Sequence, residues 1–154
     1  FRSDEMGSAV HAASLERPVR LMIALEMIGY YDSAPGSQNY PYPAMSWLYP
    51  DRGDFIAVVG RMQDINAVRQ LKAALLSSQD LSVYSMNAPG FIPGIDFSDH
   101  LNYWQHDIPA VMITDTAFYR NKQYHLPGDT ADRLNYQKMA QVVDGVITLL
   151  YNSK

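Results

Sequence analysis

The sequence contains no cysteine, and this single absence removes several chemistries at once. Disulfides, thiolate zinc clusters, thiol nucleophiles and thiol redox centres are all excluded. Positive charge is also scarce, with 12 lysine and arginine residues against 16 aspartate and glutamate residues and a formal net charge of −4. Such a balance gives no basic stripe for nucleic acid or an anionic membrane surface, so neither partner is expected.

Long apolar runs are missing as well, since none approaches the roughly 18 residues needed to cross a bilayer. No internal repeat or low-complexity segment divides the 154 residues, which are enough to bury a substantial core. The sequence also lacks a Gly-x-Ser-x-Gly elbow and a glycine-rich phosphate loop. A serine hydrolase and phosphate chemistry therefore fit poorly.

Apolar runs and helical periodicity alternate along the chain. Nearly continuous apolar runs predict strands, the first two buried on both faces, at 20–28, 55–60, 81–86 and 109–114. Apolar residues at helical spacing predict helices at 4–15, 63–78, 98–106 and 136–150. Asp4 or Ser3, Ser98 and Asn135 are the expected caps of the first, third and fourth helix. The alternation predicts an α/β fold, a layered sheet with helices on both faces and its chemistry at the carboxyl ends of the strands.

The segment 31–54 joins the first two predicted strands and holds four of the nine prolines together with several tyrosines. A loop of this length inside a domain usually carries function or folds over the surface as a flap. We interpret the segment as a packed surface flap, with a pocket wall as the alternative.

Glu26 interrupts the first apolar run near its carboxyl end. An ionised carboxylate in such a strand costs several kcal/mol unless it is paired, protonated or bound to a metal. Two interpretations stay open at this point. Glu26 is either satisfied by a neighbouring arginine or backbone group, or it has a metal-binding or catalytic role, since buried acids concentrate at functional sites.

Two histidine segments follow in the second half of the chain. His125 lies in a polar loop after the last strand, where a Pro-Gly turn can bring Asp129 toward the imidazole, as metal-binding histidines usually require. An ordinary loop histidine is the alternative. Asp99 and His100 stand at the head of the third helix, where Asp99 favours the helix N-terminus and His100 is expected in the core rather than at a metal. Asp115 is interpreted as a simple strand end.

Taken together, several segments occur in a fixed order: Leu-Glu-Met-Ile-Gly-Tyr at 25–30, Pro-Gly-Ser-Gln at 35–38, Phe-Ser-Asp-His at 97–100, Ile-Pro-Ala-Val-Met-Ile-Thr-Asp-Thr at 108–116, and Tyr-His with Asp-Thr within 124–130. This series resembles the zinc-dependent aminopeptidase family with a co-catalytic two-metal site, relatives of glutamate carboxypeptidase and glutaminyl cyclase. The resemblance covers essentially the whole chain. It implies the three-layer fold of these phosphorylase/hydrolase-like zinc peptidases, a peptide substrate and two zinc ions in the intact enzyme.

The resemblance also implies roles for individual residues. Glu26 and His125 match metal ligands, and together they would bring one carboxylate and one imidazole from distant segments. Tyr124 stands where some relatives place a group that stabilises the tetrahedral oxyanion. The implied reaction is metal-assisted peptide hydrolysis, with a bridging water activated by the metals and a glutamate as its base.

Four further residues are assigned supporting roles by the same resemblance. Asp99 and Asp129 match positions that orient the ligands and shape the pocket. Arg120 and Asn121 are expected in the wall of the substrate pocket, where either can contact a peptide backbone or carboxylate.

The sequence departs from the family pattern in one respect: it has no Glu-Glu pair and no His-x-Asp segment. In the family these elements precede a helix that Met6-Gly7-Ser8 resembles. We therefore interpret residues 1–154 as the carboxyl-terminal part of a zinc peptidase catalytic domain. Catalytic zinc normally has three protein ligands, so the chain alone is expected to bind zinc weakly at best and to be inactive.

Two other functions remain as alternatives: a non-catalytic peptide-binding or interaction domain of the same fold, and a glutaminyl-cyclase-like zinc acyltransferase. Half of an α/β domain should expose sheet edges, so we expect a homo-oligomer or a domain-swapped dimer. The family resemblance favours a secreted or periplasmic location.

Overall fold

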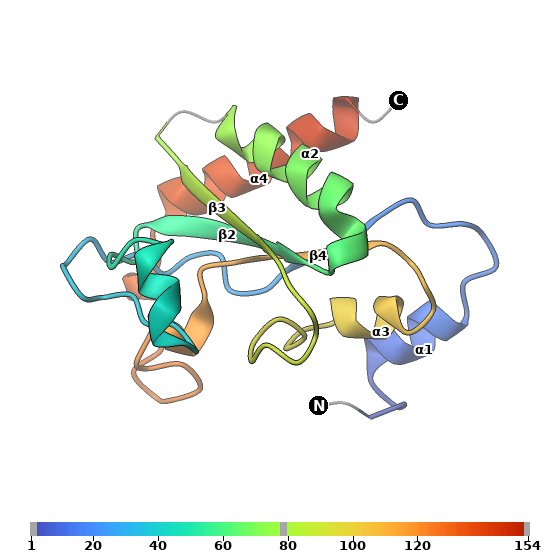
Figure 1. Ribbon diagram of the computed structural model, residues 1–154, viewed down its shortest axis with the longest axis horizontal. Helices are drawn as coiled ribbons and strands as arrows, with labels where there is room; N and C mark the ends of the chain where they lie inside the picture. The colour runs from blue at the N-terminus through green and yellow to red at the C-terminus, as the bar shows by residue number, and fades with distance from the viewer. Residues whose placement is uncertain (1–2, 78–79, 153–154) are drawn as a thin grey trace.

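Four strands and four α-helices alternate along residues 3–77 and 80–152, the part of the chain that the computed structural model describes (Figure 1). The strands are β1 (Met22–Leu25), β2 (Phe55–Gly60), β3 (Ser82–Asn87) and β4 (Ala110–Thr114). The helices are α1 (Gly7–Ala13), α2 (Ile65–Leu76), α3 (His100–Trp104) and α4 (Tyr136–Asn152). Short 3-10 helices lie at Pro43–Trp47, Met62–Asp64, Ala117–Tyr119 and Ala131–Arg133. Every predicted strand and helix is therefore present, with some of the ends shifted.

The strands form one mixed sheet in the order β1-β4-β2-β3. β1 runs parallel to β4, with Leu25 beside Ile113, and β2 runs parallel to β3. The two pairs meet in the middle, where β2 is antiparallel to β4. The carboxyl ends of β1 and β4 consequently lie at one edge of the sheet, and those of β2 and β3 lie at the opposite edge.

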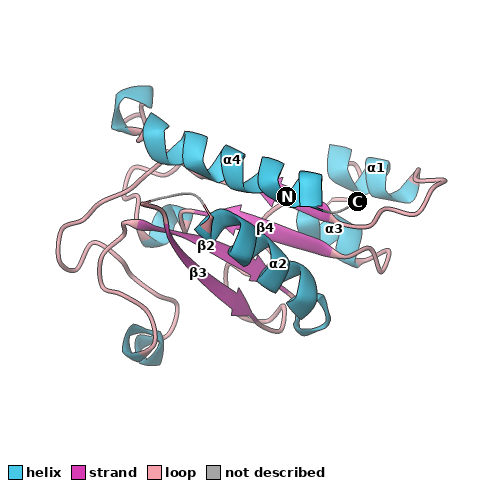
Figure 2. Cartoon of the chain, turned by 90° about the horizontal axis from the view of Figure 1, so that it is seen from above, coloured by secondary structure: helices cyan, strands magenta, loops and turns pink. Residues whose placement is uncertain are grey.

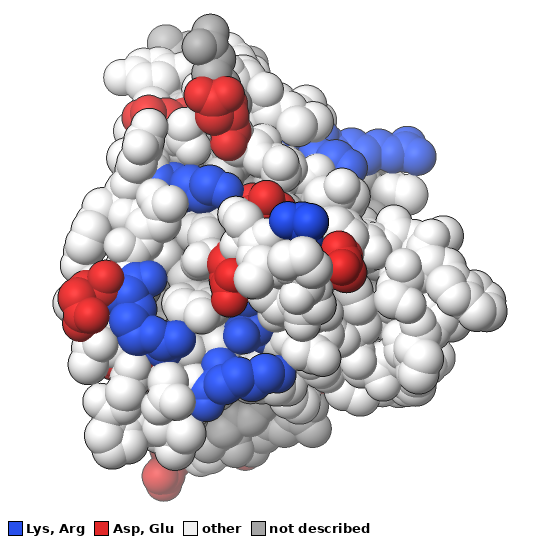
Figure 3. Space-filling view, turned by 90° about the vertical axis from the view of Figure 1, so that its left-hand side faces the viewer, with Lys and Arg blue, Asp and Glu red and all other residues white. Residues whose placement is uncertain are grey.

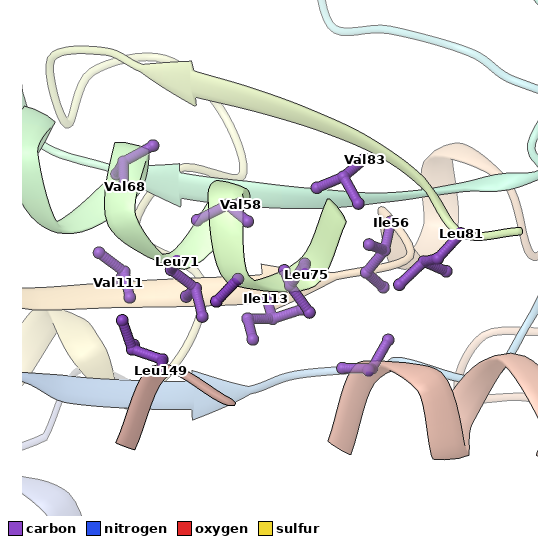
Figure 4. Packing of buried hydrophobic residues seen from close by; sticks show 12 residues of the cluster. Ile56, Val58, Val68, Leu71, Leu75, Leu81, Val83, Val111, Ile113 and Leu149 are labelled. Carbon is purple, nitrogen blue, oxygen red and sulfur yellow. The ribbon is translucent and has the colours of Figure 1, made fainter. Parts of the chain in front are cut away.

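One layer of helices is made by α2 and α4, which lie side by side on one face of the sheet (Figure 2). Alternate residues of β2 and β4 point toward them, as the two-residue period of a strand requires. This core contains Ile56, Val58, Leu71, Leu75, Val111, Ile113, Val142 and Leu149 (Figure 4). Gly145 lets the two helices approach, since a Cβ there would lie only 2.8 Å from the Cα of Leu75.

The second layer is made by α1 and α3, which pack on the other face of the sheet (Figure 1). The remaining residues of β2 and β4 form this second core with the short helices: Phe55, Ala57, Val59, Ala110 and Met112 with Ala12, Tyr103 and Trp104. The sheet thus lies between two helical layers. The predicted three-layer α/β fold is confirmed.

The first strand differs from its prediction in length and in burial. The apolar run 20–28 forms a strand only over β1, and Leu25 is 48% exposed. The expectation that this strand is buried on both faces is wrong, because β1 lies at the end of the described sheet. The same expectation is confirmed for β2, in which all six residues are buried.

The helix ends show where local signals were sufficient. α4 begins after Asn135, whose Oδ1 accepts a hydrogen bond from Lys138 N (3.0 Å), so this predicted cap is confirmed. The predicted first helix is shorter than expected: α1 begins after Met6, and neither Ser3 nor Asp4 caps it. Ser78, at the end of the second predicted helix, lies outside the described residues. No helix in the described part of the chain is long and apolar enough to cross a membrane.

Candidate active site

The candidate site lies at the sheet edge where β1 and β4 end. Glu26 and Met27 continue β1, and Asp115 continues β4. Their backbones remain paired, since Glu26 N donates to Ile113 O (3.0 Å) and Asp115 N donates to Met27 O (2.6 Å). Parallel pairing therefore brings the two acidic residues to the same edge from distant parts of the sequence.

The Glu26 carboxylate is half-buried and lines a pocket at this edge. Its Oε2 accepts a hydrogen bond of 2.9 Å from Ser98 Oγ. The predicted capping role of Ser98 is wrong, because α3 begins at His100 and its N-cap position is Asp99. The Ser98 hydroxyl instead holds one carboxylate oxygen of Glu26.

Asp99 connects the start of α3 to α1. Its Oδ1 accepts a hydrogen bond of 2.6 Å from Ser8 Oγ, and Ser8 Oγ accepts one of 2.7 Å from Asn102 Nδ2. Asp99 therefore fixes the turn that presents Ser98 to Glu26. Its implied part in orienting a metal ligand stays a prediction.

His100 is fully buried, as expected of a core histidine. Its Nε2 lies 2.7 Å from Ile95 O, and its ring packs edge-on against Trp104 with centroids 4.5 Å apart. Burial lowers the pKa of His100, so the ring is neutral at neutral pH and donates through Nε2.

Tyr124 and His125 lie together in the loop after β4. Tyr124 lines the same pocket as Glu26, and the exposed His125 ring stacks on it with centroids 3.9 Å apart. Burial raises the pKa of Tyr124, and the negative charges of Glu26 and Asp129 raise it further. The Tyr124 hydroxyl therefore keeps its proton at neutral pH. Glu26 and Tyr124 share one pocket, with His125 directly beside Tyr124.

Asp129 contacts a different residue from the one that the sequence suggested. Its Oδ1 accepts a hydrogen bond of 2.8 Å from Asn121 Nδ2. Asn121 is itself 1% exposed, and its Oδ1 accepts bonds from Gln123 N (3.0 Å) and Arg133 Nη1 (2.8 Å). Asn121 is thus occupied in holding the 121–133 loop together, which corrects the expectation that it forms part of a substrate-contacting wall.

The expectation that Arg120 lies in the wall of the substrate pocket is corrected as well. It is 3% exposed, and its guanidinium donates to the backbone oxygens of Tyr30 and Phe55 and to the Gln38 side chain. A guanidinium in this position lies behind the pocket wall rather than on its surface. The burial of Arg120 could not be predicted, because its partners are distant in the sequence. Charged residues are also usually exposed.

Asp115 was interpreted as a simple strand end, and the structure gives it a larger part. The side chain is 1% exposed and accepts hydrogen bonds from the backbone N–H groups of Gly29 (3.1 Å), Tyr30 (2.8 Å) and Ala117 (3.0 Å). Asp115 therefore fixes the backbone that follows Glu26. Burial raises its pKa to about 6, although these hydrogen bonds and Arg120 favour the charged form. The sequence feature that could have predicted this role of Asp115 is an acidic residue directly after a fully apolar strand.

The pocket itself is open and mainly apolar, with about 850 Å³ of empty space including its mouth. Part of the 31–54 loop forms one wall, which fits the alternative interpretation of this loop. The Tyr40 and Tyr49 hydroxyls donate to Pro50 O (2.6 Å) and Ser85 O (3.1 Å), so these groups are already occupied. On the face of the molecule drawn in Figure 3, acidic and basic side chains are interspersed.

The family model described as peptidase family M28 matches residues 5–150. The chain belongs to peptidase family M28. The family resemblance inferred from the order of segments is thereby confirmed.

Relatives of this M28 chain are longer than it is. The uncharacterized protein YfbL of Escherichia coli (strain K12) is 97% identical over all 154 residues, which span 48% of its length. The structure of Legionella pneumophila LapA superposes with a TM-score of 0.64 at 21% identity, over 93% of this chain and 35% of that one. An aminopeptidase from Aneurinibacillus sp. strain AM-1 gives a TM-score of 0.59 at 22% identity, over 94% and 29%. At these identities the two structures show a shared fold.

Glu26 and His125 are the two residues of this M28 chain that the family resemblance matches to metal ligands. Glu26 and His125 offer a carboxylate and an imidazole, which are groups that zinc accepts, whereas a catalytic zinc normally has three protein ligands. Among residues 3–77 and 80–152, no group of three or more histidine, aspartate or glutamate side chains is arranged to hold a metal ion.

Proposed function

We propose that this chain forms part of the active site of a zinc-dependent aminopeptidase. Its membership of peptidase family M28 supports peptide hydrolysis in general. The observation that carries the proposal is the shared pocket of Glu26 and Tyr124 near the ends of two parallel strands, with His125 stacked on Tyr124. In this proposal Glu26 and His125 each contribute one zinc ligand, and residues outside this chain supply the others.

Ser98 and Tyr124 would prepare the pocket for hydrolysis. The Ser98 hydroxyl restricts the rotation of the Glu26 carboxylate, because it binds one of the two oxygens at 2.9 Å. The Tyr124 hydroxyl stays protonated, because burial and the charge of Glu26 raise its pKa. A protonated hydroxyl at this position can donate a hydrogen bond to the negative charge that develops on a peptide carbonyl oxygen.

The pocket favours a bulky apolar side chain on the substrate. Its walls include the apolar residues Met45, Phe55, Ile92, Met112 and Phe118. Because the Tyr40 and Tyr49 hydroxyls are bonded to backbone oxygens, those walls offer little to a polar side chain. We therefore infer that peptides beginning with phenylalanine or leucine are better substrates than those beginning with serine or aspartate.

The chain alone provides the first experiment. We expect no submicromolar affinity when zinc is titrated into it by calorimetry, and no chelator-sensitive release of p-nitroaniline from leucine p-nitroanilide. Either result in the opposite direction would show that the chain assembles a complete zinc site by itself, against the proposal.

The E. coli relative, which contains a 97% identical copy of this chain, provides the second. With residues numbered as here, Tyr124→Phe should lower kcat by roughly 10²- to 10³-fold with little change in KM, as expected for a lost oxyanion donor. Tyr151→Phe, at a 71% exposed position, is the matched control. Glu26→Gln should abolish metal uptake. Unchanged uptake, or the absence of chelator-sensitive hydrolysis in the unmutated relative, would favour a non-catalytic binding domain of the same fold.

A further inference from the structure

The buried guanidinium of Arg120 lies at the base of the 31–54 loop. Arg120 directly follows the 3-10 helix Ala117–Tyr119, and its side chain extends beneath the loop rather than into the pocket. The loop is long and rich in proline, yet its two ends lie close together, since Asp32 and Gly53 form an antiparallel bridge.

Two nitrogens of Arg120 bind three separate points of this loop and its flanks. Nη1 donates to Tyr30 O (3.0 Å) just before the loop and to Phe55 O (2.9 Å) just after it. Nε donates to Gln38 Oε1 (2.9 Å) within the loop. One planar group therefore ties the entry, the exit and the interior of the loop to the segment after β4.

Gln38 links Arg120 to the pocket wall through hydrogen bonds. Its Nε2 donates to Thr116 Oγ1 (2.9 Å) and to Asn39 O (2.8 Å), and the side chain is almost completely buried. Asn39 N in turn donates to Tyr119 O (2.9 Å). Gln38, Asn39 and Thr116 all line the pocket, so the bonds that start at Arg120 end at the pocket surface.

Two aromatic rings and a glycine surround the Arg120 side chain. The guanidinium carbon lies 4.6 Å from the ring centroid of Phe55 and 5.8 Å from that of Tyr31. A Cβ on Gly53 would come within 2.5 Å of the Arg120 side chain, so only glycine fits above it. A lysine ammonium lacks the planar fork that binds Nε and Nη1 partners together.

We propose that Arg120 is a positioning residue that fastens the 31–54 loop and thereby sets the shape of the pocket wall. The fastening is independent of what the pocket binds. Its consequence for the substrate side chain rests on the proposed function, which places that side chain against this wall.

Amide hydrogen exchange in the 154-residue chain tests the fastening without any activity measurement. In Arg120→Met we expect the hydrogen-bonded amides of residues 32, 38, 39 and 53 to exchange at least roughly tenfold faster, while those of β2 and α4 keep their rates. Arg69→Met, at an exposed position on α2, should change none of them. Arg120→Lys should fold and show a smaller increase at the same amides.

Gln38→Met keeps the size of the side chain and removes the bond to Arg120. It therefore tests the fastening of the loop even if Arg120→Met does not fold. Loop amides that exchange faster in Gln38→Met and Arg120→Lys, with β2 unchanged, support the proposal. Wild-type exchange rates in both variants overturn it.

The consequence for the substrate is tested in the E. coli relative with phenylalanine and alanine p-nitroanilides. Arg120→Lys should raise KM for the phenylalanine substrate several-fold, with kcat and the alanine substrate little affected. Equal effects on both substrates would overturn the part in side-chain recognition. If the unmutated relative shows no activity, the proposed function is contradicted. The proposal that Arg120 fastens the 31–54 loop is not affected by that result, because the exchange experiment tests it separately.

Discussion

Ser98 Oγ donates a 2.9 Å hydrogen bond to Glu26 Oε2, which joins the turn before α3 to the residue after β1. The bond links two segments that are far apart in the sequence. It also crosses from the sheet to the helical layer of α1 and α3. The orientation of Glu26 therefore depends on how this layer packs.

Removing that hydroxyl should cost stability. Ser98 is 5% exposed, so Ser98→Ala removes the Oγ donor from the half-buried Glu26 Oε2, and we expect a loss of about 1–2 kcal/mol in the free energy of unfolding. Urea denaturation measures the change. Ser82→Ala, at an exposed position of β3, is the control and should lie within about 0.5 kcal/mol of wild type. Equal stability of the two variants would show that the bond contributes nothing.

Asp115 should make stability depend on pH. Burial raises its pKa from 3.8 to about 6, so between these values the folded state binds more protons than the unfolded state. The contribution of Asp115 to the free energy of unfolding is therefore greatest below about pH 4 and falls as the pH rises to about 6, by on the order of 2–3 kcal/mol. Comparing wild type with Asp115→Asn by urea denaturation at several pH values isolates this group. The free energy of unfolding of wild type minus that of Asp115→Asn should fall as the pH rises, and a constant difference would contradict the assignment.

Two glycine substitutions should act in opposite directions. Gly145→Ala places a Cβ 2.6 Å from Leu75 Cδ2, which forces α2 and α4 apart and should destabilise the chain by about 1–3 kcal/mol. Gly7→Ala meets no atom within 4 Å in α1 and should stabilise it by about 0.5–1 kcal/mol, because alanine loses less backbone entropy. Thermal unfolding monitored by circular dichroism measures both. A Gly145→Ala variant as stable as wild type would mean that α2 and α4 do not pack as described, and a destabilising Gly7→Ala would contradict the open space found at Gly7.

Self-association through β1 is the fourth expectation. Among the described residues β1 pairs only with β4, and Leu25 is 48% exposed. On α4, the apolar side chains of Val143, Ile147 and Leu150 are also exposed, by 43%, 43% and 63%. We propose that a second copy of the chain pairs with the side of β1 that does not face β4. Sedimentation velocity should show a dimer that Leu25→Lys shifts toward the monomer and Leu76→Lys does not, whereas a monomer for the wild type would contradict the proposal.

The sequence was sufficient for the elements and the layers, because each strand and helix carries a local signal. The apolar run at 55–60 coincides with β2, and Asn135 caps α4 as its side chain predicts. The antiparallel meeting of β2 and β4 has no such signal, because strand direction within a sheet follows from the connections between elements. The exposure of Leu25 depends on its place at the sheet end, which the local pattern does not contain.

The site could be predicted only in part for the same reason. Glu26 was noticeable because a carboxylate interrupts an apolar strand. Ser98 has the residue type of a helix cap, and only the folded chain shows that its hydroxyl reaches Glu26. Arg120 was expected at a surface, and its burial depends on oxygens of Tyr30 and Phe55 that no local pattern connects to it.

The mixed sheet also implies an order of assembly. β2, α2 and β3 follow one another directly in the chain, so their contacts require only short loop closures and can form early. The pairing of β1 with β4 must wait for a much longer closure, since Met22 is registered with Ala110. We therefore expect the strand ends that carry Glu26 and Asp115 to come together last. Substitutions there should mainly speed unfolding, whereas substitutions in the half built from β2 and β3 should slow folding.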